Sequence, residues 1–80
     1  MGLFGKEKSV EVLLNKGEKL IKNGKCDKGI VCFDEALKIE PNNARAWFLK
    51  NNALRYFKRY AEAMVCLDNA IKSNPDYTLA

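Results

Sequence analysis

Histidine is absent from this 80-residue sequence, and proline occurs only twice. Because histidine is the most common general base and a frequent metal ligand, its absence argues against an enzyme and against a metal site. The sequence also has no glycine-rich phosphate loop and no nucleophile–base pair. No hydrophobic run approaches the roughly 20 residues that a transmembrane helix requires. We therefore expect a non-catalytic chain without cofactor, metal or membrane span.

The sequence has few cysteines, and their spacing gives no sign of a redox or metal site. Cys26, Cys32 and Cys66 form no C-x-x-C pair and leave one thiol over in any disulfide scheme. The sequence also shows no secretory signal. These features predict a cytoplasmic protein in which the cysteines serve as small apolar side chains.

Charge of one sign is in mild excess. The chain has 14 Lys and Arg against 10 Asp and Glu, a net charge of +4. The lysines of the first third are interleaved with acidic residues, whereas a nucleic-acid surface needs basic residues clustered on one face. We interpret the lysines as the solvated faces of helices and do not expect a nucleic-acid partner.

An internal repeat organises the sequence. Pro41 aligns with Pro75 at an offset of 34 residues, and this register holds across both halves of the unit. Conservative pairs at the same offset include Ile30 with Met64 and Phe33 with Leu67. The identical pairs are Lys16 and Lys50, Leu20 and Leu54, Val31 and Val65, Cys32 and Cys66, Asp34 and Asp68, Ala36 and Ala70, and Lys38 and Lys72.

The first unit is predicted to form two helices. Ser9 can cap a helix with an apolar stripe of period 3.6, and Gly24 supplies a left-handed stop at its end. Asp27 can cap a second helix, and Pro41 stands just beyond its end. The stripe of the first helix comprises Val10, Leu13, Leu14, Gly17, Leu20 and Ile21.

The second unit repeats this pattern. Asn42 or Asn43 can cap the third helix, and the fourth starts near Tyr60 or Ala61 and runs to Asn74. No segment alternates as a half-buried strand does. The sequence therefore predicts an all-α fold of two antiparallel helix pairs.

A 34-residue helix–turn–helix unit that ends in proline resembles the tetratricopeptide repeat (TPR) family. The second unit follows the family pattern at Trp47, Leu54, Tyr60, Ala63, Leu67, Ala70 and Pro75, with Leu54 in place of the Tyr and Leu67 in place of the Phe. The first unit follows it at Gly17, Leu20, Gly24, Gly29, Phe33, Ala36 and Pro41, with Gly29 in place of the Ala. The resemblance implies a short right-handed α-solenoid, with an extension at 1–9, repeats at 10–43 and 44–77, and the start of a truncated third repeat or a tail at 78–80.

Some positions depart from the family pattern. Asn51 stands where a small residue is usual, and Lys58 stands where the first unit has Gly24. Lys16 and Lys50 replace a usual leucine, so their stems should lie along apolar surface with the ammonium in water. We expect a looser junction at Asn51 and Lys58, at about 1 kcal/mol for each residue.

The resemblance also implies where a partner would bind. In this family the first helix of each repeat lines a concave groove that holds an extended peptide or a helix. Leu14 and Phe48 stand where a clamp for a terminal carboxylate would need lysine, so such a clamp is not expected. The alternative interpretation is a solvated helix face. The groove residues would be Glu11, Leu14, Asn15, Glu18, Ile21, Lys22, Arg45, Phe48, Leu49, Asn52, Arg55 and Tyr56.

The last helix suggests a second role. Its apolar residues would lack a neighbour in a two-repeat array, because solenoids generally need three repeats or a polar cap. Either the chain belongs to a longer array, or two copies cover each other's fourth helix; a frayed monomer is the third alternative. The favoured function is thus a protein–protein interaction module, and the alternative is a homo-oligomerisation element. Its face would comprise Tyr60, Met64, Leu67 and Ile71.

Overall fold

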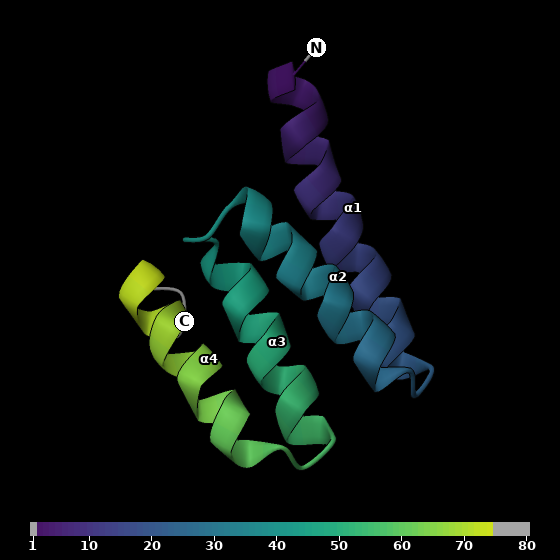
Figure 1. Cartoon of the computed structure of the whole chain (residues 1–80), viewed down its shortest axis with the longest axis vertical. Helices are drawn as coiled ribbons and strands as arrows, with labels where there is room; N and C mark the ends of the chain where they lie inside the picture. The colour runs from purple at the N-terminus through teal and green to yellow at the C-terminus, as the bar shows by residue number, and fades with distance from the viewer. Residues whose placement is uncertain (1, 75–80) are drawn as a thin grey trace.

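Four helices form two antiparallel pairs, which lie side by side in chain order (Figure 1). The computed structural model describes residues 2–74, and of residues 2–8 the backbone alone. The predicted tail at 78–80 and the end of the second repeat lie outside these residues. The helices are α1 (Gly2–Lys22), α2 (Cys26–Ile39), α3 (Ala44–Tyr56) and α4 (Tyr60–Ser73). The described residues contain no strand, and the predicted all-α fold is confirmed.

The helix starts agree with the prediction in the second pair and differ in the first. Asn43 caps α3, because its Oδ1 accepts a hydrogen bond of 2.9 Å from the backbone N–H of Ala46. The predicted cap at Ser9 is wrong, since α1 already begins at Gly2 and no proline interrupts it. The predicted cap at Asp27 is also wrong. Asp27 lies in the first turn of α2, where its carboxylate complements the helix dipole, and Lys25 is the N-cap residue.

Both pairs close through the same left-handed turn. Gly24 has a φ of 79° and Lys58, its counterpart 34 residues later, has a φ of 64°. In each turn the next N–H bonds back to a helix carbonyl, from Lys25 to Leu20 at 2.8 Å and from Arg59 to Leu54 at 2.7 Å. A lysine in this conformation is strained, whereas a glycine is not.

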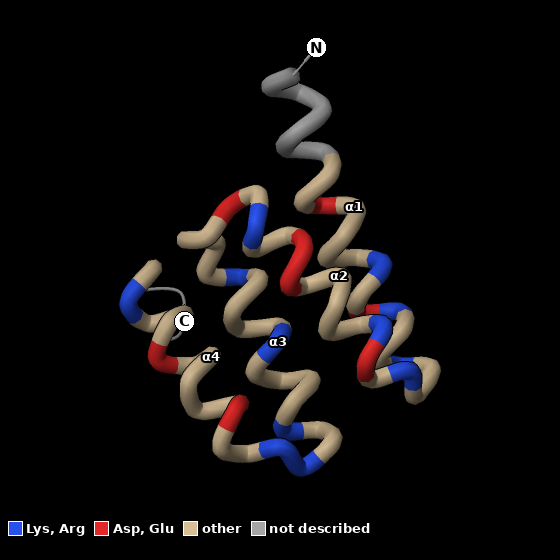
Figure 2. The backbone as a smooth tube through the Cα atoms, in the orientation of Figure 1, with Lys and Arg blue, Asp and Glu red and all other residues tan. Residues whose placement is uncertain are grey.

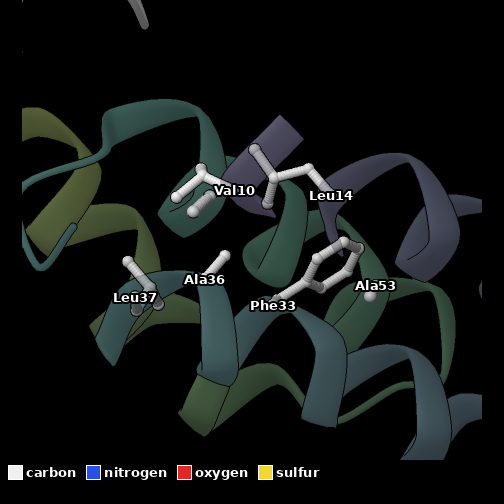
Figure 3. Packing of buried hydrophobic residues seen from close by; sticks show 7 residues of the cluster. Val10, Leu14, Phe33, Ala36, Leu37 and Ala53 are labelled. Atoms are coloured by element: carbon white, nitrogen blue, oxygen red, sulfur yellow. The ribbon is translucent and has the colours of Figure 1, made fainter. Parts of the chain in front are cut away.

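A continuous core joins the two pairs. Its main cluster comprises Val10, Leu14, Phe33, Ala36, Leu37, Ala46 and Ala53, most of which are labelled in Figure 3. A second cluster of Leu54, Ala63 and Cys66 lies within the second pair. Ile30 and Trp47 pack against both clusters and so connect them.

Two glycines allow α1 and α2 to approach closely. A Cβ atom at Gly17 would lie 2.5 Å from Cε1 of Phe33, which is itself buried. A Cβ atom at Gly29 would lie 2.5 Å from Cδ1 of Ile21 and 3.0 Å from the carbonyl oxygen of Gly17. The small residues of the repeat therefore set the spacing of the first pair.

Among residues 2–74, no helix is both long enough and apolar enough to cross a membrane.

Candidate functional site: the groove between α1 and α3

A groove of about 370 Å³ opens between α1 and α3, over the inner edge of α2. The first helix of each pair forms one wall. α1 and α3 lie next to each other because both pack against α2, which connects them in the chain. The residues that line it are Glu18, Ile21 and Lys22 from α1, Phe33 from α2, and Leu49, Asn52, Ala53 and Tyr56 from α3.

The floor of the groove is apolar and its rim is polar. Phe33 and Ala53 belong to the buried core, and Ile21 and Leu49 pack against that core from the walls. Tyr56 stands at the rim, exposed, with its ring edge-on to Phe57 at a centroid distance of 5.0 Å. An apolar floor beneath an exposed aromatic ring and polar side chains is the arrangement that anchors one side chain of a ligand.

One wall charge is already neutralised inside the chain. Nη2 of Arg45 on α3 lies 3.3 Å from Oε1 of Glu18 on α1. Both side chains are partly exposed, so the pair contributes little to stability, but it holds the two walls in register. Among the described residues Lys22 has no ion-pair partner. The groove lining therefore carries one acidic side chain that is already paired and one basic side chain that is not.

Only some of the residues predicted for the groove line it. Glu18, Asn52 and Tyr56 line the groove, as do Ile21, Lys22 and Leu49. Arg45 borders a neighbouring hollow of about 200 Å³ that it shares with Glu11.

The other predicted groove residues lie elsewhere. Leu14 is 2% exposed and packs in the core against Phe33, and it also lines the hollow next to Arg45 rather than the groove. Phe48 is half-buried and Arg55 is exposed, and neither lines the groove.

Two residues of the groove, Phe33 and Ala53, were not predicted from the sequence. Phe33 comes from α2, and its repeat position marks it as a packing residue. Ala53 is small and buried, so nothing in its side chain suggests a ligand. The way the helices pack brings both residues to the floor of the groove, and the sequence pattern does not specify that packing in such detail.

A buried asparagine lies on α3 next to the groove. Asn51 is 2% exposed, and its Nδ2 donates a long hydrogen bond of 3.4 Å to Oδ1 of Asn52. Within the described part of the chain, Oδ1 of Asn51 has no hydrogen-bond partner. A buried amide oxygen without a partner carries a desolvation cost of about 1–3 kcal/mol. The predicted weak point at Asn51 thus has a definite cause.

The face predicted for self-association is apolar and largely exposed. Met64 is 69% exposed, and Tyr60 and Ile71 are also exposed, whereas Leu67 is half-buried. Val65 adds a further exposed apolar side chain on the same helix.

Two of the three cysteines are buried, and Cys26 accepts a weak hydrogen bond of 3.9 Å from Nη1 of Arg59. Cys32 and Cys66 are buried, Cys26 is half-buried, and all three are free thiols. Burial raises the pKa of the Cys66 thiol, which keeps it neutral. No group of three or more metal-ligating side chains occurs among the described residues.

Arg59 joins the starts of α2 and α4. Its guanidinium forms a bidentate ion pair with Glu62, in which Nε donates to Oε1 and Nη2 donates to Oε2, both at 2.9 Å. Nη1 of Arg59 lies 3.9 Å from Oδ1 of Asp27. The hydrogen bonds from Arg59 lower the pKa of Glu62. Lysines and arginines gather at this end of the molecule, around the turns within the two pairs (Figure 2).

The fold and the groove define an α-helical repeat protein, and sequence comparison identifies the repeat. Two sequence models of the tetratricopeptide repeat match the chain, one at residues 10–43 and the other at residues 32–64. An uncharacterized protein of Methanocaldococcus jannaschii is 36% identical over 59 residues, which are 74% of this chain and 69% of that protein. The chain belongs to the tetratricopeptide repeat family, whose repeats generally mediate protein–protein interactions.

Proposed function

We propose that this chain is a protein-interaction module that binds an extended peptide or a helix in the groove between α1 and α3. The observation that carries this proposal is the composition of the groove, with an apolar floor, a polar rim and walls from both helix pairs. A surface of this kind is suited to a ligand that crosses from one repeat to the next.

The groove chemistry favours a ligand with one apolar anchor residue between polar groups. The anchor would lie on Phe33 and Leu49, with the ring of Tyr56 against its side. The Asn52 amide can bond to the peptide backbone, and Lys22 can meet a carboxylate of the ligand. Because Arg45 already neutralises Glu18, we do not expect selection for strongly charged ligands.

A peptide selected from a randomised display library provides the test. The proposal predicts that the peptide shifts the backbone NMR signals of Ile21, Lys22, Leu49 and Asn52. Tyr56→Ala should weaken binding by about tenfold, because an aromatic anchor typically contributes more than 1 kcal/mol. Tyr60→Ala is the matched control, since Tyr60 is an exposed tyrosine on α4 outside the groove. Equal affinity of the two variants, or shifts confined to α4, would contradict the proposal.

A second candidate function is homo-oligomerisation through α4. The observation that favours it is the exposure of Tyr60, Met64 and Ile71 on one helix. Apolar side chains grouped in this way commonly mark an interface. Sedimentation over a hundredfold range of concentration tests it. A monomer throughout that range argues against this function and leaves groove binding untouched.

A further inference from the structure

Two repeats meet inside this chain, and each end of the molecule carries residues that correspond, at the 34-residue offset, to one side of that contact. Inside the chain, Asp34 on α2 pairs with Lys50 on α3, with Oδ1 and Nζ 2.6 Å apart. The Nζ atom of Lys50 also lies 5.8 Å from the ring centre of Trp47. Beside this ion pair, Ile30 of α2 packs against the cluster of Leu54, Ala63 and Cys66.

The first helix pair carries the residues that would receive such a contact. The counterparts of Lys50, Leu54 and Cys66 are Lys16, Leu20 and Cys32. These three residues share the lining of a cleft of about 490 Å³, here called the outer cleft. Inside the chain, the equivalent place on the second pair is occupied by Ile30. The remaining lining residues of the outer cleft are Asp27, Lys28, Val31 and Glu35.

The last helix carries the residues that would make such a contact. The counterparts of Ile30, Asp34 and Leu37 are Met64, Asp68 and Ile71. Leu37 is only 8% exposed because α3 covers α2, whereas Ile71 is 41% exposed. α4 therefore presents the pattern that α2 buries inside the chain, without a helix to bury it among the described residues.

The two surfaces also carry one pair of opposite charges at corresponding repeat positions. Asp68 and Lys16 are exposed, and neither has an ion-pair partner among the described residues. α4 and the outer side of α1 lie at opposite ends of the row of helices (Figure 1). Within residues 9–74, the two surfaces are therefore too far apart to cover each other.

We propose that a second copy of this chain covers α4, and that it does so head to tail. α4 of one copy lies in the outer cleft of the next, with Met64 in the place that Ile30 takes inside the chain. Asp68 pairs with Lys16 of the next copy, as Asp34 pairs with Lys50. This arrangement continues the internal interface across molecules, and it rests on the second candidate function above.

A head-to-tail contact uses two different surfaces, so each added copy leaves one α4 and one outer cleft uncovered unless the copies close into a ring. Because the proposed contact continues the row of helices, assembly should proceed beyond two copies. The average mass in sedimentation should therefore keep rising with concentration beyond that of a dimer. A symmetric contact between two α4 helices would instead level off at two copies.

A mixing experiment with two surface variants tests the geometry. Met64→Lys with Ile71→Lys blocks α4, and Lys16→Asp with Val31→Lys blocks the outer cleft. All four positions are exposed, so helicity by circular dichroism should remain that of the unaltered protein. We expect each variant alone to be monomeric, and an equimolar mixture to form one-to-one pairs through the one intact surface of each kind.

The outcomes distinguish the head-to-tail arrangement from oligomerisation through α4, on which it rests. If the variant with the blocked outer cleft still self-associates, the head-to-tail arrangement is wrong while oligomerisation through α4 stands. If the unaltered chain stays monomeric throughout, both are wrong. The ion pair has its own test, because Asp68→Lys or Lys16→Asp alone should weaken association by about tenfold, and the double exchange should restore it. Failure of the double exchange to restore association contradicts the proposed pairing.

Discussion

Replacing Gly17 by alanine tests how the first helix pair is held together. The added Cβ would lie 2.5, 2.9 and 3.0 Å from three ring atoms of Phe33. These atoms belong to a rigid ring that is 1% exposed, so the ring cannot shift without disturbing its packed neighbours. The helices must separate instead, and overpacking of this kind costs about 1–3 kcal/mol. Alanine gains about 1 kcal/mol in helix propensity over glycine, which leaves a net loss of up to about 2 kcal/mol.

The second repeat indicates how this loss can be repaired. At the offset of 34 residues, Gly17 corresponds to Asn51 and Phe33 corresponds to Leu67. A larger residue on the first helix is thus matched by a smaller one on the second. Phe33→Leu alone should cost about 1 kcal/mol by leaving a gap. Combined with Gly17→Ala, it should cost less than the sum of the two single changes, by about 1 kcal/mol.

Urea unfolding of the four chains, followed by circular dichroism, measures this coupling. The four chains are the unaltered protein, the two single variants and the double variant. A stabilising effect of Gly17→Ala would refute the steric argument. Strict additivity of the two changes would refute the idea that Gly17 exists to accommodate the ring of Phe33.

Three further predictions concern single residues. Lys58→Gly should raise the free energy of unfolding by about 1 kcal/mol in thermal or urea melts, because Lys58 holds a φ of 64° that glycine adopts without strain. Asn51→Ala should also stabilise, by about 1 kcal/mol, since it removes a buried amide oxygen without a partner; a loss of stability would show that packing of the amide outweighs its desolvation. Burial raises the pKa of Cys66, so its stabilising contribution is complete below the ordinary thiol pKa and is lost as the pH rises above about 8.5. The slope of stability against pH in that range should become shallower in Cys66→Ala, and Cys66 should alkylate more slowly than Cys26 by mass spectrometry.

The repeat register explains most of what could be predicted. Pairing at one offset placed Gly24 and Lys58 in equivalent turns, and both turns have left-handed backbone at those residues. The cap at Asn43 was predictable because an asparagine directly before a helix has few other uses. The true starts of α1 and α2 were not predictable from Ser9 and Asp27. In both cases the helix extends past the capping residue by one or more residues, and a local capping preference is too weak to prevent this.

The boundary between groove and core was harder to predict. Leu13 and Leu14 are adjacent and both apolar, so the helical period alone does not decide which of them is more deeply buried. The rotation of α1 against α2 and α3 decides it, and that rotation puts Leu14 in the core and leaves Leu13 half-buried. The contribution of Phe33 to the groove floor depends on the same packing.

The linear arrangement of the helices has a consequence for local unfolding. In the described part of the chain α4 packs mainly on α3, and the two helix pairs meet chiefly through α3, which touches α2 and more sparsely α1. In such a chain one pair can open while the other stays folded, so amide hydrogen exchange should report separate protection for each pair. A ligand in the groove touches α1 and α3 together and would bind only when the pairs are docked. Its binding energy would therefore merge the two exchange-protection levels into one cooperative unit.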